Sequence, residues 1–194
     1  MMKHARAYIL TLLCILAAIP AAAQQGRGFY AGLTSSFKGV GIEVVTERSE
    51  DKTESFCLTA DFGGTLVRNI HDNPGVKFSW RVHYFLWNGI SDRGFNYHIY
   101  IGPGLSAGYV RDYTIHNDRG FGVMTGICTN EGILIRFDRR PISVALEFSQ
   151  ELGFHMLRGA ESGSLNMGLY RRGINSSYFP EIKIFIDLKR RTEK

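Results

Sequence analysis

The sequence has few cysteines and prolines, and no long apolar run follows its amino terminus. Three of the 194 residues are cysteine and five are proline, which excludes a disulfide-dense scaffold and a collagen-like or proline-rich chain. After residue 23 no segment approaches the ~18 consecutive apolar residues of a transmembrane helix. Charged residues make up 21% and hydrophobic residues 44%, which excludes a disordered chain. These absences leave one folded domain of ordinary size as the expectation.

Residues 1–23 have the three-part layout of a secretory signal peptide. Lys3 and Arg6 provide a basic start, residues 8–19 are apolar with one exception, and three alanines precede Gln24. The apolar stretch of 12 residues is too short to cross a bilayer as a helix, which takes ~20 residues. We therefore expect cleavage before Gln24 and export of the protein.

Neither charge nor cysteine indicates a particular partner. Without the predicted signal peptide the chain keeps 21 basic and 18 acidic residues, a formal charge of +3, and this charge is spread along the chain. No nucleic-acid partner is predicted. Cys57 and Cys128 remain, 71 residues apart; export permits a disulfide between them, but small wall-filling residues are the simpler interpretation.

Glycine and aromatic residues are abundant instead. All 22 glycines follow residue 25, and Phe, Tyr and Trp together number 24. Along most of the chain apolar residues alternate with other residues at a period of two, which predicts β-strands. Eight segments show it: Phe29–Ser35, Val40–Thr46, Ser55–Gly63, Val76–Trp87, Phe95–Val110, Arg119–Phe137, Ile142–Met156 and Tyr178–Leu188.

The connections between these segments differ in length. Asp138–Pro141 is a tight turn, Gly64–Pro74 and Arg111–Asp118 are intermediate, and Leu157–Ser177 is a long polar connection. If both termini lie on one side, the tight turn falls on that side and the three longer loops on the other. This asymmetry is typical of outer-membrane barrels, although it is imperfect, because the link at 36–39 is short and falls on the side of the longer loops.

Two residues interrupt the alternation and predict local irregularities. Pro103 stands in mid-strand between two glycines, and a proline cannot donate to the hydrogen-bond ladder. Glu131 falls on the apolar face of its segment. We expect a β-bulge or bend at each position.

The polar face indicates which side of the sheet points inward. Small residues are needed where eight strands converge in a narrow lumen, and the following lie on the polar face: Gly41, Gly63, Gly102, Gly104, Ser106, Gly108, Gly122, Gly126 and Gly153. Strands of 12 to 16 residues also suit a tilted membrane span. The prediction is an all-β fold, a closed antiparallel up-and-down transmembrane β-barrel of eight strands. A soluble lipocalin-like ligand-binding barrel, with its apolar face inward, is the alternative.

The chain resembles the small eight-stranded outer-membrane β-barrel family of Gram-negative bacteria. The segment Tyr-Ile-Gly-Pro-Gly-Leu-Ser-Ala-Gly-Tyr-Val-Arg-Asp at 100–112 is similar to the family's glycine-rich mid-barrel strand, and 169–186 resembles its last loop and closing strand. The resemblance covers 24–188 and implies an outer-membrane location, contact with membrane lipid and insertion by the barrel-insertion machinery. Family members commonly finish on a terminal aromatic residue, whereas here a charged tail, 189–194, follows. The motifs are architectural and name no activity, cofactor or extracellular ligand.

The inward positions carry charges of both signs. The predicted lumen network is Glu43, Asp61, Glu147, Glu151, Glu181 and Asp187, with Lys77, Arg81, Arg136 and Lys183, and with His83, His98 and His155. Charges inside a narrow barrel must pair or stay hydrated, and eight strands leave room for little besides side chains. We expect a plugged lumen and a structural, adhesion or surface-display role rather than a wide pore.

Two further hypotheses assign specific chemistry to inward residues. If the hairpin closes symmetrically about residues 88–93, His83 and His98 face each other and could bind a metal or act as a pH switch, although no third ligand is evident. Ser149 and His155 share a face but stand ~20 Å apart along a strand, too far for a catalytic dyad. A membrane-embedded lipid-modifying enzyme would need partners elsewhere in the chain and stays an alternative.

Overall fold

The computed structural model consists of β-strands. It describes residues 28–36, 39–62, 75–113, 119–158, 165–170 and 179–188; the predicted signal peptide and charged tail lie outside them. The strands are β1 (Phe29–Ser35), β2 (Gly39–Ser49), β3 (Lys52–Asp61), β4 (Gly75–Ser91), β5 (Phe95–Tyr113), β6 (Arg119–Phe137), β7 (Ile142–Arg158), β8 (Leu165–Leu169) and β9 (Glu181–Asp187). Within this part of the chain no helix is long and apolar enough to cross a membrane.

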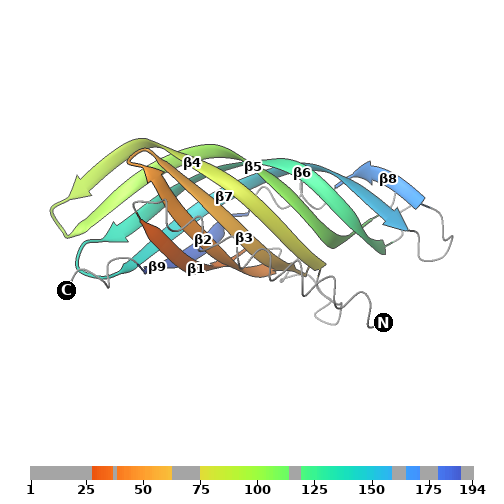
Figure 1. Ribbon diagram of the computed structural model, residues 1–194, viewed down its shortest axis with the longest axis horizontal. Coiled ribbons are helices and arrows are strands. Elements are labelled where there is room, and N and C mark those ends of the chain that lie inside the picture. Colours follow the sequence, from red (N-terminus) through yellow and green to blue (C-terminus); the bar gives the residue numbers. More distant parts are fainter. Residues whose placement is uncertain are drawn as a thin grey trace.

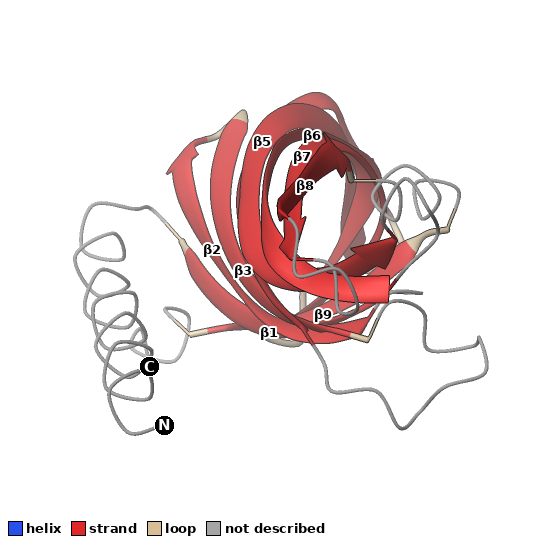
Figure 2. Cartoon of the chain, turned by 90° about the vertical axis from the view of Figure 1, so that its right-hand side faces the viewer, coloured by secondary structure: helices blue, strands red, loops and turns tan. Residues whose placement is uncertain are grey.

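The strands close into a barrel (Figures 1 and 2). Each strand from β1 to β7 pairs antiparallel with the next, β7 also pairs with β9, and β9 pairs back onto β1. β8 and β9 both pair with β7, β8 along Phe154–Arg158 and β9 along Ile142–Glu147. They therefore occupy one position in the wall, and the predicted closed eight-strand antiparallel barrel is confirmed.

The eighth position differs from the prediction in detail. The predicted long loop, 157–177, contains β8, and β7 runs on to Arg158. The reason is a five-residue alternation, in which the outer Leu165, Met167 and Leu169 are exposed while Asn166 and Gly168 are half-buried. Such a short alternation inside a polar stretch carries too little signal to separate it from a loop.

Neither Pro103 nor Glu131 produces a β-bulge, although the ladder beside Pro103 is interrupted as its sequence suggests. β5 and β6 keep one register through Pro103↔Thr129, and β6 and β7 keep one register through Glu131↔Phe148. Pro103 instead lies where pairing with β4 pauses without a register shift, between Arg81↔Gly104 and Tyr84↔Ile101. The missing proline N–H is accommodated there. The register shifts that do occur lie in β2, at Glu47/Ser49, and in β4, at Phe85/Trp87.

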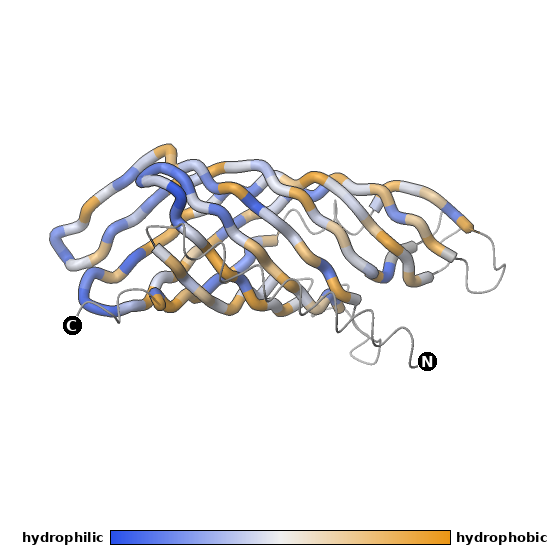
Figure 3. Tube along the Cα trace, in the orientation of Figure 1, coloured by the Kyte–Doolittle hydropathy of each residue, from blue (hydrophilic) through white to orange (hydrophobic). Residues whose placement is uncertain are grey.

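The two faces of the wall differ in polarity, and hydropathy alternates along the strands (Figure 3). The outer face exposes aliphatic and aromatic side chains all around the barrel, among them Leu33, Ile42, Val76, Ile101, Leu105, Ile127, Leu146, Leu152, Phe154, Ile182, Ile184 and Ile186. Charged side chains are buried on the inner face. This is the polarity of a transmembrane barrel and the reverse of a soluble ligand-binding barrel.

The turns after β2, β4 and β6 lie at one end of the barrel, which we call the turn side; it also holds the start of β1 and the end of β9. The link from β1 to β2 is also short, with Ser36 N–H donating to Gly39 O at 2.8 Å, but it lies at the other end. The β4–β5 hairpin extends furthest on the turn side (Figure 1), because the last residue of β4 paired with β3 is Tyr84. Its turn closes through Gly94, whose φ of 82° is in the left-handed region that favours glycine. The opposite end is the loop side.

Candidate functional site

The centre of the lumen holds a network of ion pairs between four positions of the wall. Arg81 Nη1 on β4 lies 2.6 Å from Glu147 Oε1 on β7 and 3.0 Å from Glu181 Oε2 on β9. Lys183 Nζ, also on β9, lies 2.9 Å from both Glu147 Oε1 and Glu43 Oε2 on β2. Two cations and three carboxylates thus cross-link strands that are far apart in sequence.

Glu147 is the hub of this network and is 0% exposed. Besides the two cations, it accepts a hydrogen bond of 2.7 Å from Tyr100 Oη on β5. His83 Nε2 lies 3.5 Å from Glu147 Oε2, the same oxygen that accepts from Tyr100, and His83 Nδ1 lies 3.2 Å from Thr53 Oγ1. Side chains of β4, β5 and β9 therefore supply the partners that a buried charge requires.

A second layer lies toward the loop side. Lys77 Nζ pairs with Glu151 Oε2 at 2.9 Å, and Tyr170 Oη donates to Asp61 Oδ2 at 3.1 Å. The Tyr170 ring packs edge-on against His155 with centroids 5.9 Å apart. It also contacts a small apolar cluster with Val110 and Met124. This layer places polar and apolar side chains across the lumen above the central network.

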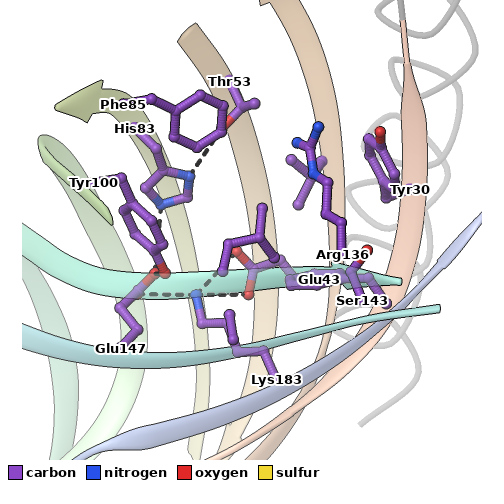
Figure 4. A pocket seen from close by; sticks show the side chains of 14 residues that line it. Tyr30, Glu43, Thr53, His83, Phe85, Tyr100, Arg136, Ser143, Glu147 and Lys183 are labelled. Carbon is purple, nitrogen blue, oxygen red and sulfur yellow. Dashed lines mark hydrogen bonds and ion pairs between the residues drawn. The ribbon is translucent and has the colours of Figure 1, made fainter. Parts of the chain in front are cut away.

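The turn side of the lumen contains a partly open pocket, which we call the cup (Figure 4). Aromatic and aliphatic side chains line its wall: Tyr30, Val45, Phe85, Tyr100, Leu134, Ala145 and Phe185. Arg136 spans the mouth, 5.2 Å from the Tyr30 ring centroid and 5.6 Å from that of Phe85, and it pairs with Glu47. The floor is the central network, whose charged groups already bond to one another.

The predicted lumen residues fall into separate groups. Glu43, Arg81, His83, Glu147, Glu181 and Lys183 form the central network; Lys77, Glu151, Asp61 and His155 lie in the layer above it; Arg136 lies at the mouth of the cup. Asp187 is half-buried at the turn side, in register with Tyr30. His98 is outside the network, where its Nδ1 lies 2.6 Å from Asn88 Oδ1.

The hypothesis that His83 and His98 face each other is wrong. His98 is opposite Asn88, whereas His83 lies between Arg81 and Tyr84, which pair with Gly104 and Ile101. The hairpin turns at Ser91–Phe95, nearer the carboxyl end of the segment than assumed, because β4 runs on through Ser91. Among the described residues no group of three possible ligands could hold a metal ion. Cys57 and Cys128 are buried free thiols.

Several lumen side chains were not singled out from the sequence. Tyr100 lies on the inward face by simple alternation, so its hydroxyl could have been matched to an inward acid. Glu47, the partner of Arg136, follows the inward parity of Glu43, but the bulge at its end obscures that pattern. Tyr170 carried no signal, because it lies in the stretch expected to be a loop.

Comparison with known proteins adds one structural likeness. The crystal structure of the N-terminal beta-barrel domain of Pseudomonas aeruginosa OprF is similar to this chain with a TM-score of 0.47 and 11% sequence identity, covering 82% of this chain and 96% of that one. No protein-family model matches the chain, and no curated protein matches it. The strand pairing and the polarity of the two faces, described above, define the fold.

Proposed function

We propose that the protein is an outer-membrane barrel with a closed lumen that serves as a structural, adhesion or surface-display protein. The observation that supports this most directly is the network around Glu147, which links β2, β4, β5, β7 and β9 across the lumen. The exposed apolar outer face supplies the contact with lipid.

The network argues against a wide pore on energetic grounds. Passage of an ion would require Arg81, Lys183 and Glu147 to separate, which leaves buried charges without partners, at ~3–5 kcal/mol for each broken pair. The layer of Lys77 and Glu151 presents the same obstacle again. In a barrel of this size the inner charges therefore hold the lumen closed and provide no path for ions.

Conductance in a planar bilayer tests the closed lumen. We expect no steady conductance from the unmodified full chain. The double variant Arg81→Ala and Glu147→Ala removes Glu147 together with one of its cationic partners. It should raise the frequency of brief channel openings. A large, long-lived conductance of the unmodified chain would contradict the proposal.

Display of the loop side tests the second part of the proposal. An epitope inserted at position 161, between β7 and β8, should be labelled by antibody on intact cells. The matched control, the same epitope inserted at Arg139 in the turn between β6 and β7, should be labelled only after the outer membrane is permeabilised. The reverse pattern, or equal labelling, would contradict loop display at the surface.

A further inference from the structure

The outer face of β6 and β7 carries a polar pair inside the apolar belt. Gln150 Nε2 donates to Glu131 Oε1 at 3.3 Å, and both side chains are exposed. Exposed apolar side chains precede and follow them on both strands: Ile127 and Ile133 on β6, Phe148 and Leu152 on β7. The pair therefore lies within the belt and not at its rim.

A carboxylate and an amide that face hydrocarbon are unfavourable and are usually covered or functional. Within the described residues, Glu131 and Gln150 have one bond, to each other. That bond leaves the second carboxylate oxygen and the second amide hydrogen open. A partner that presents a hydrogen-bond donor and an acceptor at the same depth in the membrane would satisfy the Glu131 carboxylate and the Gln150 amide.

Small outward residues lie beside the pair. Thr129 pairs with Pro103 and Thr125 with Ala107 across β6 and β5, and all four are exposed. Short side chains let a second membrane surface approach closely, which favours van der Waals packing and hydrogen bonds across the contact. Thr129 adjoins the polar pair, in register with Gln150, and Thr125 lies beyond Ile127 on the same face. We call Thr125, Thr129, Glu131 and Gln150 the β6 patch.

We propose that the β6 patch is the contact between two copies of this chain in the membrane. A two-fold axis along the membrane normal brings equal depths of the two copies together, so that each Gln150 amide faces the other copy's Glu131 carboxylate. The patch is self-complementary in this arrangement, whereas a different partner would have to present a matching donor and acceptor at the same depth. The dimer goes beyond the closed-barrel function and rests on the lipid-facing belt proposed with it.

Site-directed cross-linking tests the contact in native outer membranes. We expect Thr129→Cys to give a dimer band with a short bismaleimide. Ile42→Cys, an equally outward position on β2, should give none, and neither should the unmodified chain, whose Cys57 and Cys128 are buried. Equal cross-linking at Ile42→Cys, a band of another partner's mass, or Thr129→Cys that reacts with a monofunctional maleimide yet forms no dimer would overturn the proposal.

Removal of the polar pair supplies the second test. The double variant Glu131→Leu and Gln150→Leu, built on Thr129→Cys, removes the hydrogen bonds across the contact. It should lower the dimer fraction about tenfold, because each such bond in a membrane contributes modestly and more than one is lost. The same variant should keep its heat-modifiable gel migration and unfold at higher urea. Glu131→Gln, which keeps an acceptor, should retain most of the dimer.

The outcomes separate the dimer from the barrel. An intact, heat-modifiable barrel whose dimer fraction is unchanged by the two leucines overturns the β6 patch as the contact and leaves the barrel standing. A chain with no heat-modifiable form at all overturns the lipid-facing belt, and the dimer with it.

Discussion

Glu147 shows how one buried residue organises the lumen. Its side chain contacts groups from β4, β5 and β9, so that three segments are held at one point of the barrel. Buried ion pairs are weak sources of net stability, but removal of one partner is strongly destabilising because the other charge remains. The network therefore specifies one arrangement of the wall more than it adds to the free energy of unfolding.

Glu147→Leu tests this role. It leaves Arg81 and Lys183 with fewer partners, and we expect the free energy of unfolding to fall by ~3–5 kcal/mol. The measurement is urea unfolding of the refolded full chain in detergent micelles, followed by tryptophan fluorescence. Glu54→Gln, which removes the partner of Arg48 near the turn side, should change the value by less than ~1 kcal/mol. Equal effects of the two variants on the free energy of unfolding would contradict the role of Glu147 as the hub of the network.

Gly132 makes room for the Tyr100 hydroxyl. A Cβ at this position would lie 2.7 Å from Tyr100 Oη and 2.6 Å from the backbone oxygen of Leu146. Gly132→Ala should displace Tyr100 from Glu147 and lower the free energy of unfolding by ~1–3 kcal/mol. Gly168→Ala is the matched control, since nothing lies within 4 Å of its Cβ position, and urea titration of both variants would reveal the difference. If Gly132→Ala left the free energy of unfolding unchanged, the Tyr100 hydroxyl would not need the space that Gly132 leaves.

At the scale of elements, β8 and β9 are two short strands in one position of the wall. β9 pairs on both sides, with β1 and β7, whereas β8 pairs with β7 in the described residues. Tyr170, directly after β8, ties the end of this strand to β3 through Asp61. On the side of β8 away from β7, a side-chain contact therefore stands where β9 has a second ladder of backbone hydrogen bonds.

Hydrogen exchange should reveal this difference. Amides of β8 have one ladder to protect them, so we expect them to exchange at least about tenfold faster than amides of β9. Mass spectrometry of the chain in micelles can separate the two peptides. Tyr170→Phe, which deletes the hydroxyl and keeps the ring, should accelerate exchange in β8 further and leave β9 unchanged. Equal protection of β8 and β9 would contradict the edge position.

At the scale of the whole molecule, the outer face decides the environment of the barrel. Ile184 on β9 is 52% exposed in the apolar belt, and Ile90 is 87% exposed on the β4–β5 hairpin, beyond the end of β3. Both are outward isoleucines, so the same substitution can be made at each. Ile184 is expected to face hydrocarbon, whereas Ile90, the more exposed of the two, is expected to lie outside it.

Ile184→Lys and Ile90→Lys therefore form a matched pair. In lipid vesicles we expect Ile184→Lys to lower the free energy of unfolding by ~2–4 kcal/mol and Ile90→Lys by ~0–1 kcal/mol, the difference between midplane and interface. Urea titration in vesicles measures both. A barrel surrounded by water would tolerate the two lysines equally, which is the outcome that would contradict the membrane assignment.

Much of the fold follows from local pattern. Alternation over Val76–Trp87 or Ile142–Met156 places Lys77, Arg81 and Glu147 on one face without knowledge of any distant residue. Periodicity could not reveal β8, because five residues are too short, or the register of β4, because the turn position depends on pairing with β5. The location of His98 outside the network follows from that register.

The sequence by itself determined the long strands and their two faces, since a period of two is a local property of the backbone. Only the tertiary structure decided which inner charges meet. Arg81 and Glu147 are 66 residues apart, and their contact depends on how every strand pairs around the barrel. It likewise decided that Glu131, which the alternation marked as a flaw in an apolar face, stays in register and pairs with Gln150 on the outer surface.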